Sequence, residues 1–307
     1  MMKFIFSMIL SCLITLLCDA QGYYQYKNGN RQIVYASEVD SLIFFSGNPT
    51  EDNPEEHAPI PRAGNILYGK KWVACGDSFT EGDFNSLTNP ADYIFQDGPY
   101  KGKKKVYPYY IGRRNNMKIV NEAISGSIMA LDKTFVADSV TKDINTRSPF
   151  SYKRYKNPEL ADADYITLWF GINDVSNTNL GNIEDVTNET YYGAWNVVLE
   201  YLIRQNPFAK IGIIITNGSG SWAYKNATRQ IARKWGIPYL DMSGDYQVPA
   251  IFERQIVTAD DPVNLGYTDV ARQIRTEAFR VSATNGHPNA RCHEYESFFI
   301  ENWLRSL

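Results

Sequence analysis

The feature that most constrains the fold is an alternation of short apolar runs with helical segments, which continues from residue 65 to the C-terminus. The helical segments have apolar side chains at helical spacing and fall at 191–204, 222–235, 268–279 and 295–304. The apolar runs contain β-branched or aromatic residues and fall at 72–75, 118–121, 165–170, 211–216 and 238–241. This order predicts an α/β fold in which about five parallel strands carry helices on both faces of the sheet.

The first twenty residues have the pattern of a secretory signal peptide. Lys3 precedes an apolar run over residues 4–17 that is too short to span a bilayer comfortably. Cys18 and Ala20 then place small residues at the two positions of an A-x-A-like cleavage site. Cleavage after Ala20 is the first expectation, and a lipoprotein signal using Cys18 is weaker because Leu17 precedes it. We therefore expect a secreted, periplasmic or cell-surface protein with no transmembrane segment in the mature chain.

Residues 21–46 predict a small β unit ahead of the main domain. Aromatic and apolar residues flank Asn28-Gly29, a dipeptide that favours a hairpin turn. Residues 47–64 contain four prolines among polar residues and predict a linker. The remaining residues, 65–307, predict one sizeable α/β domain, since a single core stops growing near ~250–300 residues.

The net charge argues against a nucleic-acid-binding protein, and the cysteine content argues against a disulfide-rich one. The net charge is −3 and the pI about 5.7, which argues against a nucleic-acid partner. The basic run at 101–105 is predicted to be a solvated loop. Only Cys75 and Cys292 follow the predicted signal, so a disulfide framework is not expected, and Cys75 is predicted to be a small buried side chain.

Chemically useful residues follow the first three predicted strands. Gly76-Asp77-Ser78 follows the first, Ser125-Gly126 the second, and Gly171-Ile172-Asn173-Asp174 the third. Ligands of an open parallel sheet bind beyond the carboxyl ends of its strands, where such loops converge. Acyl transfer needs an activated hydroxyl, a base and hydrogen-bond donors for an oxyanion, and these loops together with a histidine can supply them.

Four blocks, read in order, resemble those of the SGNH (GDSL-like) hydrolases. They are the segments 75–82 (CGDSFTEG), 120–126 (VNEAISG), 171–174 (GIND) and 287–289 (HPN). The resemblance covers about 240 residues and implies a three-layer, flavodoxin-like fold with no metal and no organic cofactor. It also implies that Ser78 is the nucleophile, His287 the general base, and Gly126 and Asn173 oxyanion donors.

The remaining histidines have weaker claims to be the base. His293 falls within or at the start of the last predicted helix, where a structural or exposed role is expected, and His57 lies in the predicted linker. Asp77 and Asp174 flank the key residues, but a carboxylate after Gly76 is expected to cap a turn or bind backbone N–H groups.

The family pattern fails at one position. An aspartate usually stands three residues before the histidine, and here that residue is Thr284, followed by Asn285 and Gly286. Three explanations remain open: a backbone carbonyl or Thr284 orients His287, a distant carboxylate does so, or catalysis is weak. The distant carboxylates that come into question are Asp260, Asp261 and Asp269.

The leading functional expectation is a secreted serine esterase that removes an O-acetyl group from a carbohydrate. The carbohydrate part follows from the secretion signal and the common use of the family. Two alternatives remain: a lipase or short-chain acyl esterase, and a catalytically degenerate carbohydrate-binding module, for which the missing aspartate is the main argument. A dinucleotide-dependent enzyme is excluded because no glycine-rich fingerprint follows the first strand.

Overall fold

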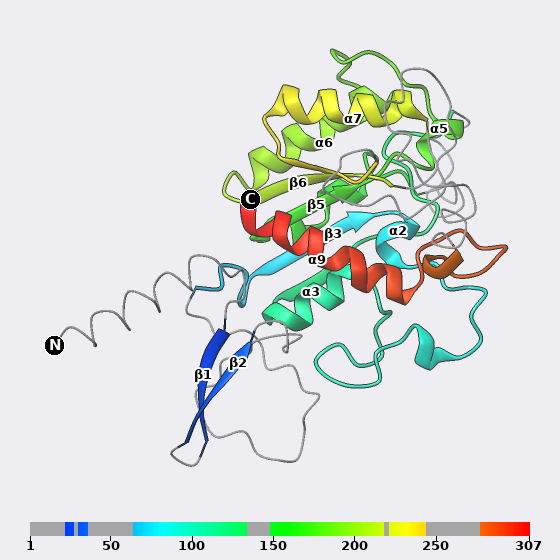
Figure 1. The fold of residues 1–307 in the computed structure, drawn as a ribbon. Coiled ribbons are helices and arrows are strands. Elements are labelled where there is room, and N and C mark those ends of the chain that lie inside the picture. Colours follow the sequence, from blue (N-terminus) through cyan, green and yellow to red (C-terminus); the bar gives the residue numbers. More distant parts are fainter. Residues whose placement is uncertain (1–21, 28–29, 36–63, 134–147, 218–220, 244–276) are drawn as a thin grey trace, which may run out of the picture. The chain divides into compact units, whose positions relative to one another are not determined.

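The computed structural model describes residues 22–27, 30–35, 64–133, 148–217, 221–243 and 277–307 (Figure 1). The chain divides into two compact units, Met1–Pro54 and Glu55–Leu307. In the first unit, β1 (Gly22–Lys27) and β2 (Asn30–Tyr35) pair antiparallel, with Lys27 opposite Asn30. The predicted hairpin strands are therefore present, whereas the predicted turn, the signal peptide and the linker up to residue 63 lie outside the described residues.

The second unit is built on a five-stranded parallel sheet with the order β4-β3-β5-β6-β7. This is the 2-1-3-4-5 order of flavodoxin-like sheets, so the predicted fold is confirmed. All five predicted strands are found, with ends that differ by at most a few residues. Their bounds are β3 (Lys71–Gly76), β4 (Lys118–Asn121), β5 (Tyr165–Trp169), β6 (Lys210–Ile215) and β7 (Tyr239–Asp241).

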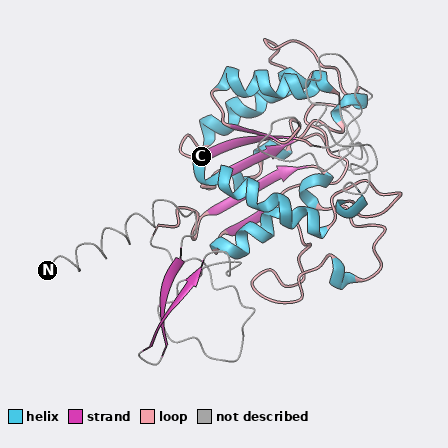
Figure 2. Cartoon of the chain, viewed as in Figure 1, coloured by secondary structure: helices cyan, strands magenta, loops and turns pink. Residues whose placement is uncertain are grey.

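Helices cover both faces of the sheet, as the ribbon and cartoon views show (Figures 1 and 2). Helices α6 (Tyr191–Gln205) and α7 (Trp222–Trp235) pack on one face, and α3 (Tyr107–Asn115) and α9 (Ala290–Ser306) on the other. Side chains of a strand alternate between the faces, so Val73 and Cys75 of β3 join the first core and Trp72 and Ala74 the second. This alternation gives three layers with two apolar cores.

Most helix boundaries are set by local capping. Thr190 accepts a hydrogen bond from the Gly193 N–H at the start of α6, and α7 runs from its cap Ser221 to Gly236, which adopts a left-handed conformation. The last helix begins five residues earlier than the predicted 295–304 because Asn289 caps it, accepting from the Cys292 N–H at 2.9 Å. The predicted helix at 268–279 lies almost entirely outside the described residues.

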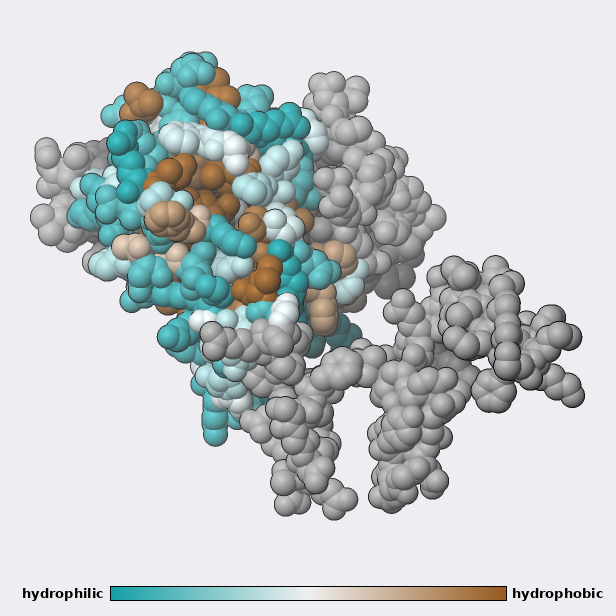
Figure 3. Space-filling view, turned by 90° about the vertical axis from the view of Figure 1, so that its left-hand side faces the viewer, coloured by the Kyte–Doolittle hydropathy of each residue, from teal (hydrophilic) through white to brown (hydrophobic). Residues whose placement is uncertain are grey.

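Apolar side chains gather at the amino ends of the strands. A group of apolar residues among hydrophilic ones is visible on the face at the amino ends of the strands (Figure 3). On that side, a hollow is lined by residues that include Ile203, Ile211, Ile237 and Leu307. The site described below lies at the opposite, carboxyl edge. Within the described ranges, no helix is long and apolar enough to cross a membrane.

Candidate active site

Ser78 stands directly beyond the carboxyl end of β3. It is the first residue of α2 (Ser78–Glu81), whose N-cap, Asp77, accepts a hydrogen bond from the Phe79 N–H at 2.9 Å. The turn requires glycine at position 76, because a Cβ there would lie 2.4 Å from Thr80 Oγ1 and 3.0 Å from the Trp169 carbonyl oxygen. Strand, turn and cap together fix the position of the Ser78 hydroxyl.

His287 meets this hydroxyl from the other end of the chain. Its Nε2 lies 2.8 Å from Ser78 Oγ, although 209 residues separate the two. A short loop before α9 carries the histidine. The Val281 N–H donates to the His287 carbonyl at 2.8 Å, and the Asn289 N–H to the Phe279 carbonyl at 2.9 Å. The structure therefore brings together the two residues that the sequence analysis selected as nucleophile and base.

The other imidazole nitrogen faces residues that the sequence analysis did not select. His287 Nδ1 lies 2.6 Å from Asn285 Oδ1 and 3.9 Å from Asp83 Oδ2. Thr284 is exposed and its hydroxyl pairs with Ser282 at 3.3 Å. Asp260, Asp261 and Asp269 lie outside the described residues. Burial lowers the pKa of His287, and the nearby Asp83 carboxylate raises it in part.

Gly126 and Asn173 follow β4 and β5, the two strands that flank β3. Gly126 has a φ of +77°, which glycine adopts without strain, and a Cβ there would meet no atom within 4 Å. Asn173 Nδ2 donates to the Ser127 carbonyl at 3.0 Å, which joins the two loops. The Ile124 N–H donates to the Gly76 carbonyl at 3.1 Å and ties the Gly126 loop to the turn of Ser78.

This arrangement leaves donors available at the same edge of the sheet. One N–H of the Asn173 amide is bound to Ser127 and the second is not needed for that bond. The Ser78 N–H lies in the first turn of α2, where no preceding helical carbonyl can accept it. Such donors can bind an oxyanion that forms beside Ser78 Oγ.

Asp77 and Asp174, which stand next to Ser78 and Asn173 in the sequence, are buried and accept hydrogen bonds from backbone N–H groups. Asp77 caps α2, as expected, and Asp174 accepts from the N–H groups of Met129 at 3.0 Å and Ala130 at 3.2 Å. Burial raises the pKa of each carboxyl to about 7. Their contacts are those of residues that hold loops in place.

His293 lies inside α9, as expected from the sequence, but it is fully buried. Its ring stacks on Tyr107 with 6.3 Å between ring centres and meets the edge of Phe84. Burial lowers its pKa to about 3. A ring with this pKa and these neighbours has the character of a core residue. His57 lies outside the described residues.

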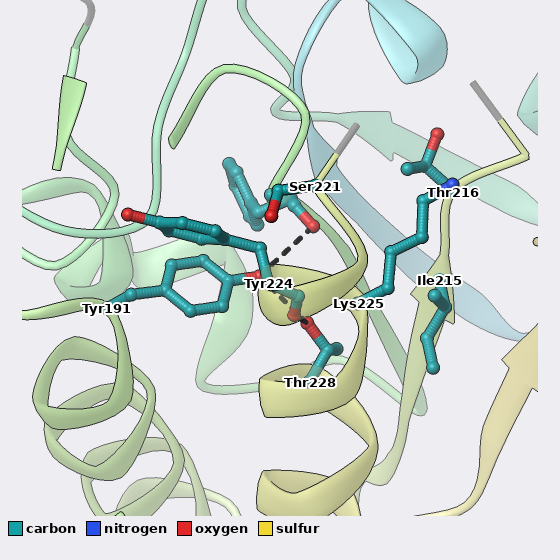
Figure 4. Close-up of a pocket in the computed structure, with 9 residues that line it drawn as sticks. Tyr191, Ile215, Thr216, Ser221, Tyr224, Lys225 and Thr228 are labelled. Atoms are coloured by element: carbon teal, nitrogen blue, oxygen red, sulfur yellow. Dashed lines mark hydrogen bonds between the residues drawn. The ribbon is translucent and has the colours of Figure 1, made fainter. Parts of the chain in front are cut away.

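A small pocket opens at the same edge, beyond β5 and β6 (Figure 4). Its empty volume is about 220 Å³, including space open to solvent, and Gly171 lines it two residues before Asn173. The Tyr191 hydroxyl, which pairs with Thr228 Oγ1 at 2.8 Å, forms part of the polar wall. Ser78 and His287 do not line this pocket. In the described part of the chain, no three His, Cys, Asp or Glu side chains are grouped to hold a metal ion.

Comparison with known proteins identifies the family of this chain. The model of the GDSL-like lipase/acylhydrolase family matches residues 73–247, which is more than half of the chain. The chain belongs to this family, and it is a hydrolase that acts on ester bonds. The matched segment includes Ser78, Gly126 and Asn173 and ends before His287. No match was found among curated proteins.

Solved structures show the same fold at low sequence identity, with 52 matching chains. One crystal structure has a TM-score of 0.54 and 17% identity, over 78% of this chain and 98% of the other. A protein from Lactobacillus plantarum has a TM-score of 0.52 and 20% identity, also over 78% and 98%. At this identity, the likeness establishes the α/β fold and leaves the substrate open.

Proposed function

We propose that the protein hydrolyses carboxylic esters through an acyl-enzyme formed on Ser78, with His287 as the general base. One observation carries the proposal: the 2.8 Å contact between Ser78 Oγ and His287 Nε2 at the carboxyl edge of the sheet. A hydroxyl becomes a useful nucleophile when an adjacent base can accept its proton. A module that only binds its ligand needs no such contact.

The reaction proceeds in two halves. Ser78 Oγ attacks the ester carbonyl while its proton passes to His287 Nε2, and the protonated ring then donates that proton to the leaving alcohol. A water molecule, deprotonated by His287, attacks the acyl-enzyme and releases the carboxylic acid and free Ser78. In both halves, the N–H groups of Ser78 and Gly126 and the Asn173 amide stabilise the oxyanion.

For the substrate, we propose an O-acetyl ester of a carbohydrate. The support is the predicted signal peptide, which would place the enzyme outside the cytoplasm, together with the common use of the family. A lipid or simple short-chain ester is the alternative substrate within the same chemistry, and the experiment below distinguishes the two.

The test uses the full chain and its Ser78→Ala and His287→Ala variants. Hydrolysis of p-nitrophenyl acetate and butyrate is measured first, followed by acetate release from acetylated xylan. We expect kcat to fall by ~10⁴-fold or more in each variant, as in other hydrolases whose nucleophile or base is removed. Ser176→Ala, which changes an exposed serine, serves as the matched control.

The outcomes separate the chemistry from the substrate. Equal turnover by the wild type and the Ser78→Ala variant on every ester would contradict the esterase mechanism. Turnover of p-nitrophenyl esters with no acetate release from xylan would instead support the simple-ester alternative.

A further inference from the structure

The imidazole of His287 requires a partner at Nδ1 for the proposed chemistry. A triad acid fixes the ring in the tautomer that leaves Nε2 free to accept a proton, and it stabilises the imidazolium that forms during turnover. The usual position of that acid is occupied by Thr284, which is exposed and pairs with Ser282. Two other residues lie at Nδ1, and each can supply one of these two functions.

Asn285 can supply the orientation. The His287 backbone N–H donates to Asn285 Oδ1 at 3.1 Å, so the oxygen of the amide, not its nitrogen, must face the histidine. The same oxygen lies 2.6 Å from Nδ1. Because an amide oxygen only accepts, Nδ1 must carry the proton, and Nε2 is left with a lone pair directed at Ser78 Oγ.

Asp83 can supply the charge. Its Oδ2 lies 3.9 Å from His287 Nδ1, and Asn285 Nδ2 donates to the Asp83 carbonyl oxygen at 3.3 Å. The Asp83 side chain is only 18% exposed, so solvent screens it less than a surface carboxylate. No Lys or Arg is within ion-pair distance of Asp83 among the described residues, and its charge therefore acts mainly on the imidazole.

Contacts between the two loops hold this arrangement. Ser86 Oγ donates to Ser282 Oγ at 3.1 Å, and Phe84 and Val281 pack in one apolar cluster. Asp83 and Asn285 are thus fixed relative to one another although 202 residues separate them. Among the described residues, Phe79 also faces the ring, at 5.7 Å between ring centres, and the neutral, buried His293 lies close enough to interact with it electrostatically.

We propose that Asn285 and Asp83 divide the work of the absent triad acid: Asn285 fixes the tautomer of His287, and the Asp83 carboxylate stabilises its protonated form. Both are positioning residues, because they act on the ester only through His287. The inference rests on the proposed Ser78–His287 mechanism and adds the groups that make it efficient.

Steady-state kinetics over a range of pH test the two roles separately. We expect Asn285→Leu, which keeps the branched shape of the side chain but can accept no hydrogen bond, to lower kcat ~10- to 100-fold with little change in KM. Asn285→Asp retains an acceptor oxygen and should restore most of the activity. Asn85→Leu changes an exposed asparagine in the Asp83 loop and is the matched control.

The effect of Asp83 appears in the acid limb of kcat/KM. That limb reports the pKa of His287 in the free enzyme, which the Asp83 carboxylate raises. We expect Asp83→Asn to move the limb to lower pH and to lower the plateau of kcat ~10-fold, since the imidazolium is less stabilised. Asp92→Asn, at an exposed aspartate, should leave both unchanged.

The imidazole ¹⁵N shifts provide a readout that does not depend on activity. The chain has only three histidines, so the His287 signals can be assigned with His57→Ala and His293→Phe. We expect the Nδ1–H tautomer in the wild type and a shift toward Nε2–H in Asn285→Leu.

An Nε2–H tautomer in the wild type, or folded Asn285→Leu and Asp83→Asn variants with unchanged kcat and pH profile, would overturn the inference. If Ser78→Ala still abolishes turnover in that case, the proposed function stands and only this inference fails. If the wild type has no Ser78-dependent activity, the proposed function fails and the role of Asp83 in turnover fails with it. An Nδ1–H tautomer would then support only the orientation of His287 by Asn285.

Discussion

At the scale of single residues, the site is held together by contacts between loops that lie far apart in the sequence. Ser78 and His287 are in direct contact, and Gly126 and Asn173 lie on loops joined through Ser127. The two residues at His287 Nδ1 were not identifiable, because Asp83 and Asn285 are 202 positions apart and no spacing relates them. The only signal was negative: threonine stands where the family has aspartate, which left open what orients His287.

Asn173 provides a prediction at this scale. Replacing it with alanine removes the amide donor, and we expect kcat to fall ~10²- to 10³-fold, which is the effect of removing one oxyanion donor in other hydrolases. KM should change little, because the charge on the oxygen develops only in the transition state. Steady-state kinetics on p-nitrophenyl acetate measure both constants.

Asn182→Ala is the control for this prediction, since Asn182 is exposed and its side chain is not part of the site. If Asn173→Ala raised KM and left kcat unchanged, Asn173 would bind the ground state and would not be an oxyanion donor.

At the scale of elements, the strands were predictable, but helix α3 was not. Each core strand is a short apolar run buried on both faces, which is a strong pattern in sequence. Helix α3 (Tyr107–Asn115) contains a proline, a glycine and three tyrosines, all poor helix formers. Its proline lies in the first turn, where its missing N–H costs nothing, and packing on α9 and β4 supplies the rest of its stability.

Glu81, the last residue of α2, provides the prediction at this scale because it joins two elements of the site. Its Oε2 accepts from the Ser125 N–H at 2.6 Å, one residue before Gly126, and its Oε1 from Lys104 Nζ at 2.8 Å. We expect Glu81→Ala to free the Gly126 loop and lower kcat ~10-fold or more, since small displacements of catalytic groups are costly.

Lys104→Gln is the informative comparison for Glu81→Ala. It removes the ion pair, which is part-exposed and worth ~0–1 kcal/mol, but leaves the bond from Ser125 to Glu81. Similar losses of kcat in both variants would mean that the charge pair, and not the bond to the loop, positions Gly126.

At the scale of the whole molecule, the topology explains why residues from all parts of the hydrolase unit meet. β3 lies between β4 and β5, so the loops that carry Ser78, Gly126 and Asn173 leave neighbouring strands at the same edge. The loop before α9 then brings His287 to that edge from the far end of the chain. The sequence predicted that the three strand loops meet, because parallel strands place their carboxyl ends at one edge of the sheet. His287 was selected from its HPN block, which resembles that of the SGNH hydrolases.

The buried His293 predicts how global stability depends on pH. Burial lowers its pKa to about 3, whereas in an unfolded chain it is near ~6.5. Between these values the unfolded chain binds more protons than the folded one, so this histidine makes the free energy of unfolding decrease as pH falls. The stability that neutral His293 contributes to the folded state is fully present above pH ~6.5 and is lost progressively as the pH falls below that value.

Urea unfolding of the wild type and His293→Phe at pH 7.5 and 4.5 tests this expectation. We expect the wild type to lose about 3 kcal/mol more than the variant between the two pH values. The difference between the proteins is the relevant quantity, because Asp77, Asp174 and Glu296, with pKa values raised to about 7, act with the opposite sign. Identical pH dependence in both proteins would contradict the assignment of a neutral, buried His293.

Covalent labelling shows whether His287 activates Ser78 as a nucleophile. The full chain is treated with a fluorophosphonate, and the modified residue is located by mass spectrometry of peptides. We predict one adduct, on Ser78, that forms at least ~10²-fold more slowly in the folded His287→Ala variant, as expected for loss of a general base. Labelling at another residue, or at the same rate in both proteins, would contradict the account.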